Sequence, residues 1–185
     1  MKKRKKKWLK FRHRVVRVVA GPIISFLCKL KYGVKIEKFR KQGDRQYLIL
    51  TVTLFDQFFV GLAFKGPVYY LATEDIFSLG FLSSLLRWAV APIPIKKQTT
   101  DVSAVMNCMR VAKEGGTIAL APEGNRTYSG KTEYMNPAIA SLAKKLGLPI
   151  ALYRIEGGYG ACPRWSDVVR KGEVRLPVLR LGELL

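Results

Sequence analysis

The sequence predicts an α/β fold with a mostly parallel central sheet flanked by helices. Short apolar, β-prone runs alternate along the chain with segments of helical periodicity, an order typical of parallel sheets. Glycine or proline stands at most of the junctions between these segments. With 185 residues, 49% of them hydrophobic, the chain is long and apolar enough to bury one sizeable core.

The expected strands are apolar or β-branched runs that are too short for helices. They lie at residues 32–39, 47–52, 68–72, 93–95, 117–120 and 149–155. The first alternates in part and is expected at an edge of a sheet. The second is apolar almost throughout, as in a strand that is covered on both faces.

The expected helices follow these strands. They lie at residues 56–64, 79–89, 101–113, 137–146 and 165–171. Gly66-Pro67 ends the first, and the second carries Leu82, Leu85 and Leu86 on one face. Residues 176–185 are apolar without a clear period.

Helix boundaries are predicted best in the middle of the chain. Asp101 is a suitable N-cap for the third helix, and Gly115-Gly116 closes it. Pro137 is expected at the first position of the fourth helix, which Gly147 ends.

Positive charge is concentrated at the N-terminus. Residues 1–45 contain 17 Lys and Arg and two acids, whereas residues 46–185 contain 16 Lys and Arg and 11 acids. Such an arm binds nucleic acid or an anionic membrane. Nucleic acid is disfavoured, because charge outside the arm is modest and the aromatic residues lie in apolar runs rather than between cations.

An amphipathic, basic helical segment is predicted within residues 1–30. Trp8 begins an apolar stretch in which Arg12, Arg14 and Arg17 are interspersed, a pattern that suits a helix lying among lipid headgroups. Gly21-Pro22 interrupts the stretch, which falls short of the roughly 20 apolar residues of a spanning helix. We therefore expect a peripheral anchor on the cytoplasmic face. The alternatives are a signal peptide, which lysines directly after the stretch disfavour, and a helix packed on the domain behind a solvated arm.

The three cysteines, Cys28, Cys108 and Cys162, are far apart. Their spacing matches no metal site and no disulfide framework, so we expect them to behave as small hydrophobic residues. No metal site and no Gly-rich nucleotide loop are predicted.

The segment Ala121-Pro122-Glu123-Gly124-Asn125-Arg126-Thr127 follows the strand predicted at residues 117–120. Open α/β sheets bind ligands at the carboxyl ends of their strands. Arg126 offers a planar fork of donors for a phosphate, and Gly124 lets backbone approach a ligand closely. By itself, Pro-Glu-Gly is equally typical of an ordinary turn with a surface ion pair.

Four blocks resemble the glycerolipid O-acyltransferases, and in particular the bacterial 1-acylglycerol-3-phosphate (lysophosphatidate) acyltransferases. The strongest, residues 113–127, is similar to the family's Gly-Gly, strand, Phe-Pro-Glu-Gly-Thr-Arg-Ser block, with Ala121 replacing Phe and Asn125 replacing Thr. The resemblance implies that three residues bind the glycerol phosphate acceptor: Glu123, Gly124 and Arg126.

Two further blocks agree with the resemblance. Residues 93–97 are similar to a short strand that ends in a cation, usually Arg, contacting the acceptor phosphate. Lys97 takes this position and keeps the charge without the bidentate geometry, and a solvated lysine is the alternative of equal weight. Residues 148–152 resemble the family's Leu-Pro-Ile strand, which implies packing.

The remaining block departs from the family. Its pattern is Asn-His, four residues and Asp; Asp56 matches the Asp, but Leu50 and Thr51 replace Asn-His. In the family, the His takes the proton of the attacking glycerol hydroxyl, since an imidazole pKa of about 6.5 suits a general base. A threonine hydroxyl does not titrate in that range. Asp56, with a reference pKa of about 3.9, becomes a useful base only if burial raises that pKa.

The chain's single histidine does not fall in this block. His13 lies in the basic arm between Arg12 and Arg14, where a surface position is expected. Three explanations of the missing motif histidine stay open: a family member without turnover, an altered copy of an active enzyme, or a different base.

The resemblance implies transfer of an acyl group from acyl-CoA or acyl carrier protein to 1-acylglycerol-3-phosphate in phospholipid synthesis, without a further cofactor. The alternative is a non-catalytic homologue that binds glycerophospholipid at the membrane surface. Asp56 is the candidate catalytic residue. We expect a membrane-interface segment at residues 1–30, an acyltransferase-like domain at residues 31–175 and a shortened C-terminal end at residues 176–185.

Overall fold

The fold is seen in a computed structural model of the chain. The structure describes residues 7–36, 46–51, 61–64, 66–73, 80–96, 101–124, 134–153, 159, 175–176 and 178–182.

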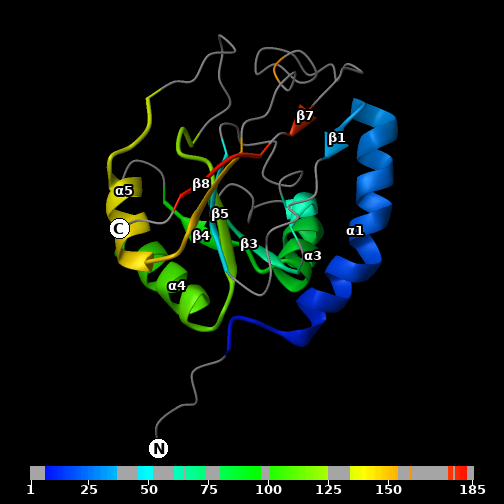
Figure 1. Ribbon diagram of the computed structural model, residues 1–185. Coiled ribbons are helices and arrows are strands. Elements are labelled where there is room, and N and C mark those ends of the chain that lie inside the picture. The colour runs from blue at the N-terminus through cyan, green and yellow to red at the C-terminus, as the bar shows by residue number, and fades with distance from the viewer. Residues whose placement is uncertain are drawn as a thin grey trace, which may run out of the picture.

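A six-stranded sheet in the order β4-β3-β5-β2-β6-β8 forms the centre of the molecule (Figure 1). Its strands are β2 (Leu48–Thr51), β3 (Val68–Thr73), β4 (Ile93–Ile95), β5 (Thr117–Leu120), β6 (Ile150–Tyr153) and β8 (Val178–Gly182). The first five pair in parallel, and β8 is antiparallel beside β6. A separate parallel pair joins β1 (Lys35–Ile36) to β7 (Arg175–Leu176). The predicted α/β fold with a mostly parallel sheet is confirmed.

Helices cover both faces of the sheet. On one face, α4 (Val102–Lys113) and α5 (Ala138–Leu146) pack against a cluster that includes Leu48 of β2. On the other, Phe64 packs against a cluster that includes Ile49 and has Cys28 of α1 (Phe11–Tyr32) at its margin. Consecutive residues of β2 thus enter opposite clusters, because side chains alternate along a strand. This explains why the whole run is apolar.

The N-terminal helix is longer than expected. Residues 32–39 were expected to form a strand, but α1 continues through Tyr32 and the strand is confined to Lys35–Ile36 within the described residues. Gly33 ends the helix at φ 64°, and its N–H donates to the carbonyl of Lys29. Pro22 lies inside the helix rather than at its end.

The central boundaries follow the local signals. The Asp101 side chain accepts a hydrogen bond from the Ala104 N–H at 3.0 Å, so the predicted N-cap is confirmed. Gly115 has a φ of 88°, a conformation that favours glycine. A Cβ on Gly116 would lie 2.5 Å from the Val111 side chain, so glycine is required there for packing. The helix predicted to begin at Pro137 begins one residue later.

The segment before α1 is hydrogen-bonded to residues on the side of the sheet opposite α1. Glu114, just after α4, accepts hydrogen bonds through Oε2 from the backbone N–H groups of Trp8 and Leu9, at 2.8 and 2.9 Å. The Trp8 indole Nε1 donates to the Ala91 carbonyl at 3.1 Å. Trp8 and Leu9 pack beside the α4 cluster, whereas α1 lies over the opposite face. The chain therefore crosses the sheet near the amino end of β5.

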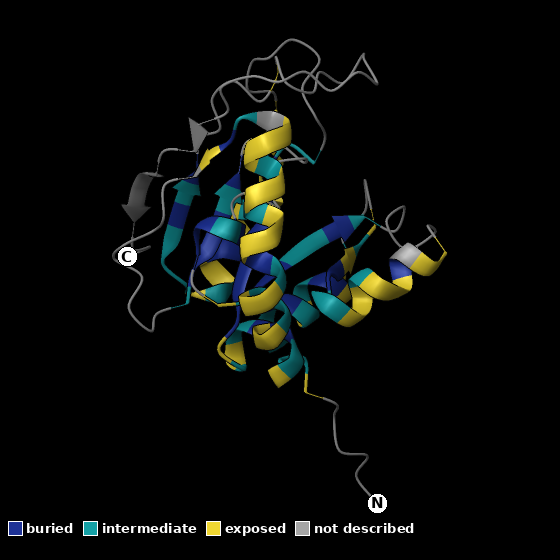
Figure 2. Cartoon of the chain, turned by 90° about the vertical axis from the view of Figure 1, so that its right-hand side faces the viewer, coloured by how far each residue is buried: buried dark blue, intermediate teal, exposed yellow. Residues whose placement is uncertain are grey.

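α1 leaves most of its large apolar side chains exposed and turns two polar side chains toward the domain. The side toward the domain carries His13, Arg17 and Gly21, spaced four residues apart. The outward side carries large apolar residues that are 44 to 80% exposed: Phe11, Val15, Val18, Val19, Ile23, Phe26, Leu27 and Leu30. Figure 2 shows this exposed side of α1 facing the viewer. In the described part of the chain, no helix is long and apolar enough to cross a membrane.

Replacing Glu114 with alanine should lower the free energy of unfolding by about 1–3 kcal/mol, because two backbone donors lose their acceptor together. Urea denaturation monitored by circular dichroism measures the change. Lys113→Ala, one residue earlier and exposed, is the matched control and should have little effect. Equal stability of Glu114→Ala and wild type would contradict the structural role of this carboxylate.

Candidate functional site

Parallel pairing brings the sequence blocks to one edge of the sheet. β2 ends at Thr51 and lies between β5, which ends at Leu120, and β6, which ends at Tyr153. Leu50 aligns with Leu120, and Thr51 aligns with Tyr153. Neighbouring strands are about 4.8 Å apart, so the block that contains Thr51 and the loop after Leu120 leave the same edge side by side. β4 ends at this edge as well, separated from β5 by β3.

The loop after β5 begins with a tight turn. The Gly124 N–H donates to the Ala121 carbonyl at 3.1 Å, which closes a four-residue turn with Pro122 at its second position. Gly124 has a φ of 65°, in the left-handed region that favours glycine. Both carboxylate oxygens of Glu123 are shielded from solvent. Glu123 and Gly124 are therefore presented on a defined turn rather than on an open loop.

Thr51 is fully buried at the end of β2. By strand alternation its side chain shares a face with Ile49, on the side of the sheet that α1 and Phe64 cover. Its neighbour Leu50 packs toward the α4 side. The two replacements in the family's Asn-His pair thus lie on opposite faces, and the histidine position is the one that faces α1.

Three predicted site residues, Asp56, Lys97 and Arg126, lie outside the described residues. Lys96 is the described residue directly before Lys97, and its backbone N–H donates to Asp101 Oδ2 at 3.0 Å. The backbone N–H of Ala104 and then that of Lys96 hold the pKa of the Asp101 carboxyl below its usual value. Through these two hydrogen bonds, the Asp101 carboxylate links the end of β4 to the start of α4.

His13 is buried, only 2% exposed, so the expected surface position is wrong. Its Nδ1 lies 3.0 Å from the Tyr69 hydroxyl, and the two rings meet edge to face with centroids 5.7 Å apart. Burial first, and then the charges of Arg12 and Lys10, lower the pKa of His13. Burial also raises the pKa of Tyr69 to about 12, so this hydroxyl stays protonated.

His13 does not replace the motif histidine. Tyr69 aligns with Ile118 of β5, which aligns with Leu48 of β2. Leu48 precedes Thr51 by three residues, a rise of roughly 10 Å along the strand. The only histidine of the chain therefore lies near the amino half of the sheet, away from the edge that carries the predicted acceptor loop.

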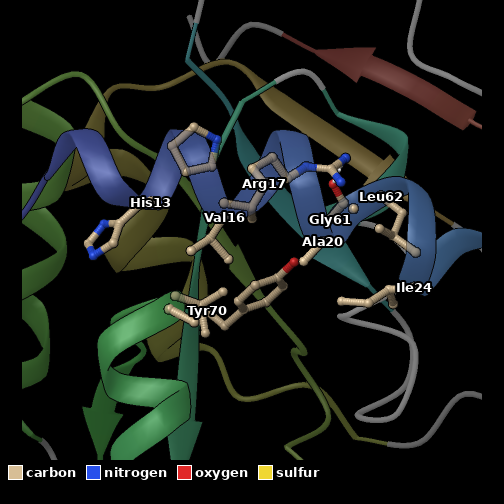
Figure 3. Close-up of a pocket in the computed structure, with 13 residues that line it drawn as sticks. His13, Val16, Arg17, Ala20, Ile24, Gly61, Leu62 and Tyr70 are labelled. Carbon is tan, nitrogen blue, oxygen red and sulfur yellow. Dashed lines mark hydrogen bonds between the residues drawn. The ribbon is translucent and has the colours of Figure 1, made fainter.

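Arg17 joins α1 to the segment that follows Asp56 in the sequence. Its Nη2 donates to the carbonyls of Gly61 and Phe64, at 2.8 and 2.9 Å. Between α1 and β3 lies an apolar cavity of about 90 Å³, into which Tyr70 rises from the sheet (Figure 3). Sequence reasoning assigned Arg17 to the lipid-facing cations; its spacing of four residues from His13 was the available signal that both share the inward side.

Comparisons with known proteins agree with the four blocks. A family model described as Acyltransferase matches residues 39–155, a segment that contains all four. The 1-acyl-sn-glycerol-3-phosphate acyltransferase BAT2, chloroplastic, of Brassica napus is 24% identical over 102 residues, which are 52% of this chain and 30% of that protein. The crystal structure of the 1-acyl-sn-glycerophosphate (LPA) acyltransferase PlsC from Thermotoga maritima matches with a TM-score of 0.75 at 20% identity. That match covers 93% of this chain and 70% of PlsC, and at this identity it establishes the fold alone.

The molecule is thus an α/β protein whose candidate binding loops leave the carboxyl edge of a parallel sheet. Because the family model covers more than half of its residues, the chain belongs to the Acyltransferase family. Among the described residues, no group of three or more His, Cys, Asp or Glu side chains is arranged to hold a metal ion.

The burial of His13 predicts a pH-dependent stability. A folded-state pKa below 6.5 means that the unfolded chain takes up the proton first as the pH falls. The contribution of neutral His13 to the free energy of unfolding is complete above about pH 6.5. Below that pH it is lost at up to about 1.4 kcal/mol per pH unit, until the folded-state pKa is reached. Urea denaturation between pH 5 and 8 should show this slope in wild type and a smaller one in His13→Gln. Identical slopes in the two proteins would contradict a neutral, buried imidazole.

Proposed function

We propose that this protein transfers an acyl group from a thioester donor to a lysophosphatidate-like acceptor at a membrane surface. The observation that carries the proposal is the turn at Ala121–Gly124, which begins the acceptor block on the strand next to the one that ends at Thr51. The names of the two similar proteins, both lysophosphatidate acyltransferases, agree with this acceptor. The segment similar to this chain is only 30% of the Brassica napus protein, so the proposal rests on the domain that the two proteins share.

The acceptor phosphate is bound by cations. Arg126, two residues after the turn, supplies two parallel donors, and Lys97 after β4 supplies a second positive charge. A carboxylate repels a phosphate, so Glu123 serves either to orient Arg126 or to accept a hydrogen bond from the glycerol part of the acceptor. Gly124 leaves room for the acceptor beside the backbone.

The reaction needs no cofactor, because the donor carries the activated acyl group. The acceptor hydroxyl attacks the thioester carbonyl and loses its proton, a carbon–oxygen ester bond forms and the carbon–sulfur bond breaks. CoA or acyl carrier protein leaves as the thiolate, which takes up a proton to give the free thiol. Asp56 is the proposed catalytic residue of the first block. Thr51 occupies the histidine position and does not act as a base, so proton removal is the step in which this chain differs from the family pattern.

The protein attaches to the membrane from its cytoplasmic face, through α1. Its outward side is apolar along the helix, and α1 contains no acid and, besides the inward Arg17, four cations: Arg12, Arg14, Lys29 and Lys31. Large apolar residues flanked by cations match the interface of a bilayer with anionic headgroups. Acceptor and product are amphipathic lipids, so this attachment brings the site to its substrate.

The phosphate role is tested with Arg126. Arg126→Ala should weaken lysophosphatidate binding by about 10- to 100-fold, because a charge-assisted bidentate contact is lost. Arg126→Lys should restore part of the affinity. Calorimetric titration in detergent micelles measures the dissociation constants, and Arg110→Ala on α4 is the matched control. Unchanged affinity in Arg126→Ala would assign the phosphate to other residues.

The proton-transfer step is tested by restoring the motif. Leu50→Asn/Thr51→His should raise kcat by about 10²- to 10⁴-fold, the usual contribution of a positioned base, and the gain should disappear as the pH falls through about 6.5. Release of free thiol from acyl-CoA in the presence of lysophosphatidate measures the rate. Leu50→Asn/Thr51→Gln, of similar size and without a titrating group, is the control. If the wild type and both variants bind lysophosphatidate but none of them releases thiol, the non-catalytic alternative is favoured.

A further inference from the structure

The helix α3 (Phe81–Ala89) exposes a row of large apolar side chains. Phe81 is 85% exposed, Leu85 46% and Trp88 51%. Their spacing of four and three residues places them on one side of the helix. Ser83, by contrast, is turned inward and is only 3% exposed. Like α1, this helix turns a polar residue inward and exposes large apolar residues.

α3 adjoins α1. The Arg12 guanidinium lies over the ring of Trp88, 5.6 Å from its centroid. Ala89 and Val90 at the end of α3 line the same cavity as Val16 of α1. In Figure 2, α3 lies beside α1 and runs in a different direction. The exposed apolar side chains of the two helices therefore belong to neighbouring elements that are not collinear.

The charged side chains on α1 and α3 themselves are all basic. α1 and α3 contain no Asp or Glu. Lys10, Arg14, Lys29 and Arg87 are exposed on these helices or directly before α1. An aromatic and aliphatic surface bordered by cations is complementary to anionic lipid headgroups above an apolar interior.

We propose that α3 is a second lipid-contacting element, with Phe81, Leu85 and Trp88 entering the headgroup region of an anionic membrane beside α1. The inference rests on the membrane attachment proposed above and extends it to a helix in the interior of the sequence. One helix lying in the interface leaves the protein free to rotate about its axis. A second contact in another direction fixes the tilt of the sheet relative to the lipid.

Vesicle binding tests the proposal with three paired variants. Phe81→Ser/Leu85→Ser changes α3, and Val18→Ser/Phe26→Ser changes the outward side of α1. Val102→Ser/Met106→Ser removes apolar residues of similar exposure from α4, which packs on the other face of the sheet, and is the matched control. Co-sedimentation with phosphatidylcholine vesicles, with and without phosphatidylglycerol, measures the partition coefficient, and circular dichroism verifies that each variant is folded.

Wild type should bind only the vesicles that contain phosphatidylglycerol. The paired substitution on α3 should lower the partition coefficient about tenfold relative to wild type, and the paired substitution on α4 should leave it unchanged. In a Trp165→Phe background, which leaves Trp8 and Trp88, quenching of tryptophan fluorescence by brominated lipid should be strong. It should be largely lost when Trp88→Phe is added, since Trp8 is held against Ala91.

The outcomes separate the two levels of the proposal. If the α1 pair loses binding while the α3 pair binds as wild type does, the role of α3 is wrong and the attachment through α1 stands. If wild type binds neither vesicle, the proposed membrane attachment itself fails. If sedimentation equilibrium shows a dimer that only the α3 pair dissociates, and vesicle binding is unaffected, a second copy of this chain covers the surface and the lipid proposal is overturned.

Discussion

The parallel pairing of β2 between β5 and β6 is the constraint on which the site depends. It places Leu50 beside Leu120 and Thr51 beside Tyr153, so loops from separate parts of the chain leave one edge together. Burial of β2 on both faces fixes this register, because a shift by one residue would exchange Leu48 and Ile49 between the two clusters. The position of the predicted acceptor loop thus follows from the packing of β2 in the sheet core.

α1 is held on the domain by a few specific contacts rather than by burial of most of its large apolar residues. Arg17 bonds to two carbonyls, His13 meets the Tyr69 hydroxyl, and an apolar cavity remains between the helix and β3. A helix that leaves most of its large apolar side chains in water gains little from burial. Its arrangement is favourable once another apolar phase covers the outer side.

Much of the fold could be predicted because its signals are local. The strand at Ile93–Ile95 and the Asp101 cap depend on residues within one turn of each other, and both are found where they were expected. The burial of His13 depends instead on Tyr69, which is 56 positions away, and no local pattern encodes that contact. Within the site, the turn at Gly124 was predictable from its residue types, whereas the roles of Asp56, Lys97 and Arg126 remain predictions because these residues lie outside the described structure.

The attachment of Trp8 to Glu114 also sets an order of events during synthesis. The two residues are 106 positions apart, so the N-terminal helix leaves the ribosome long before its anchoring carboxylate has been made. At about 5–20 residues per second, this interval lasts roughly 5–20 s. Throughout it, the apolar side of the helix has no folded domain beside it. The helix is therefore complete before the domain that it packs against, and its outer side is accessible to other partners throughout that interval.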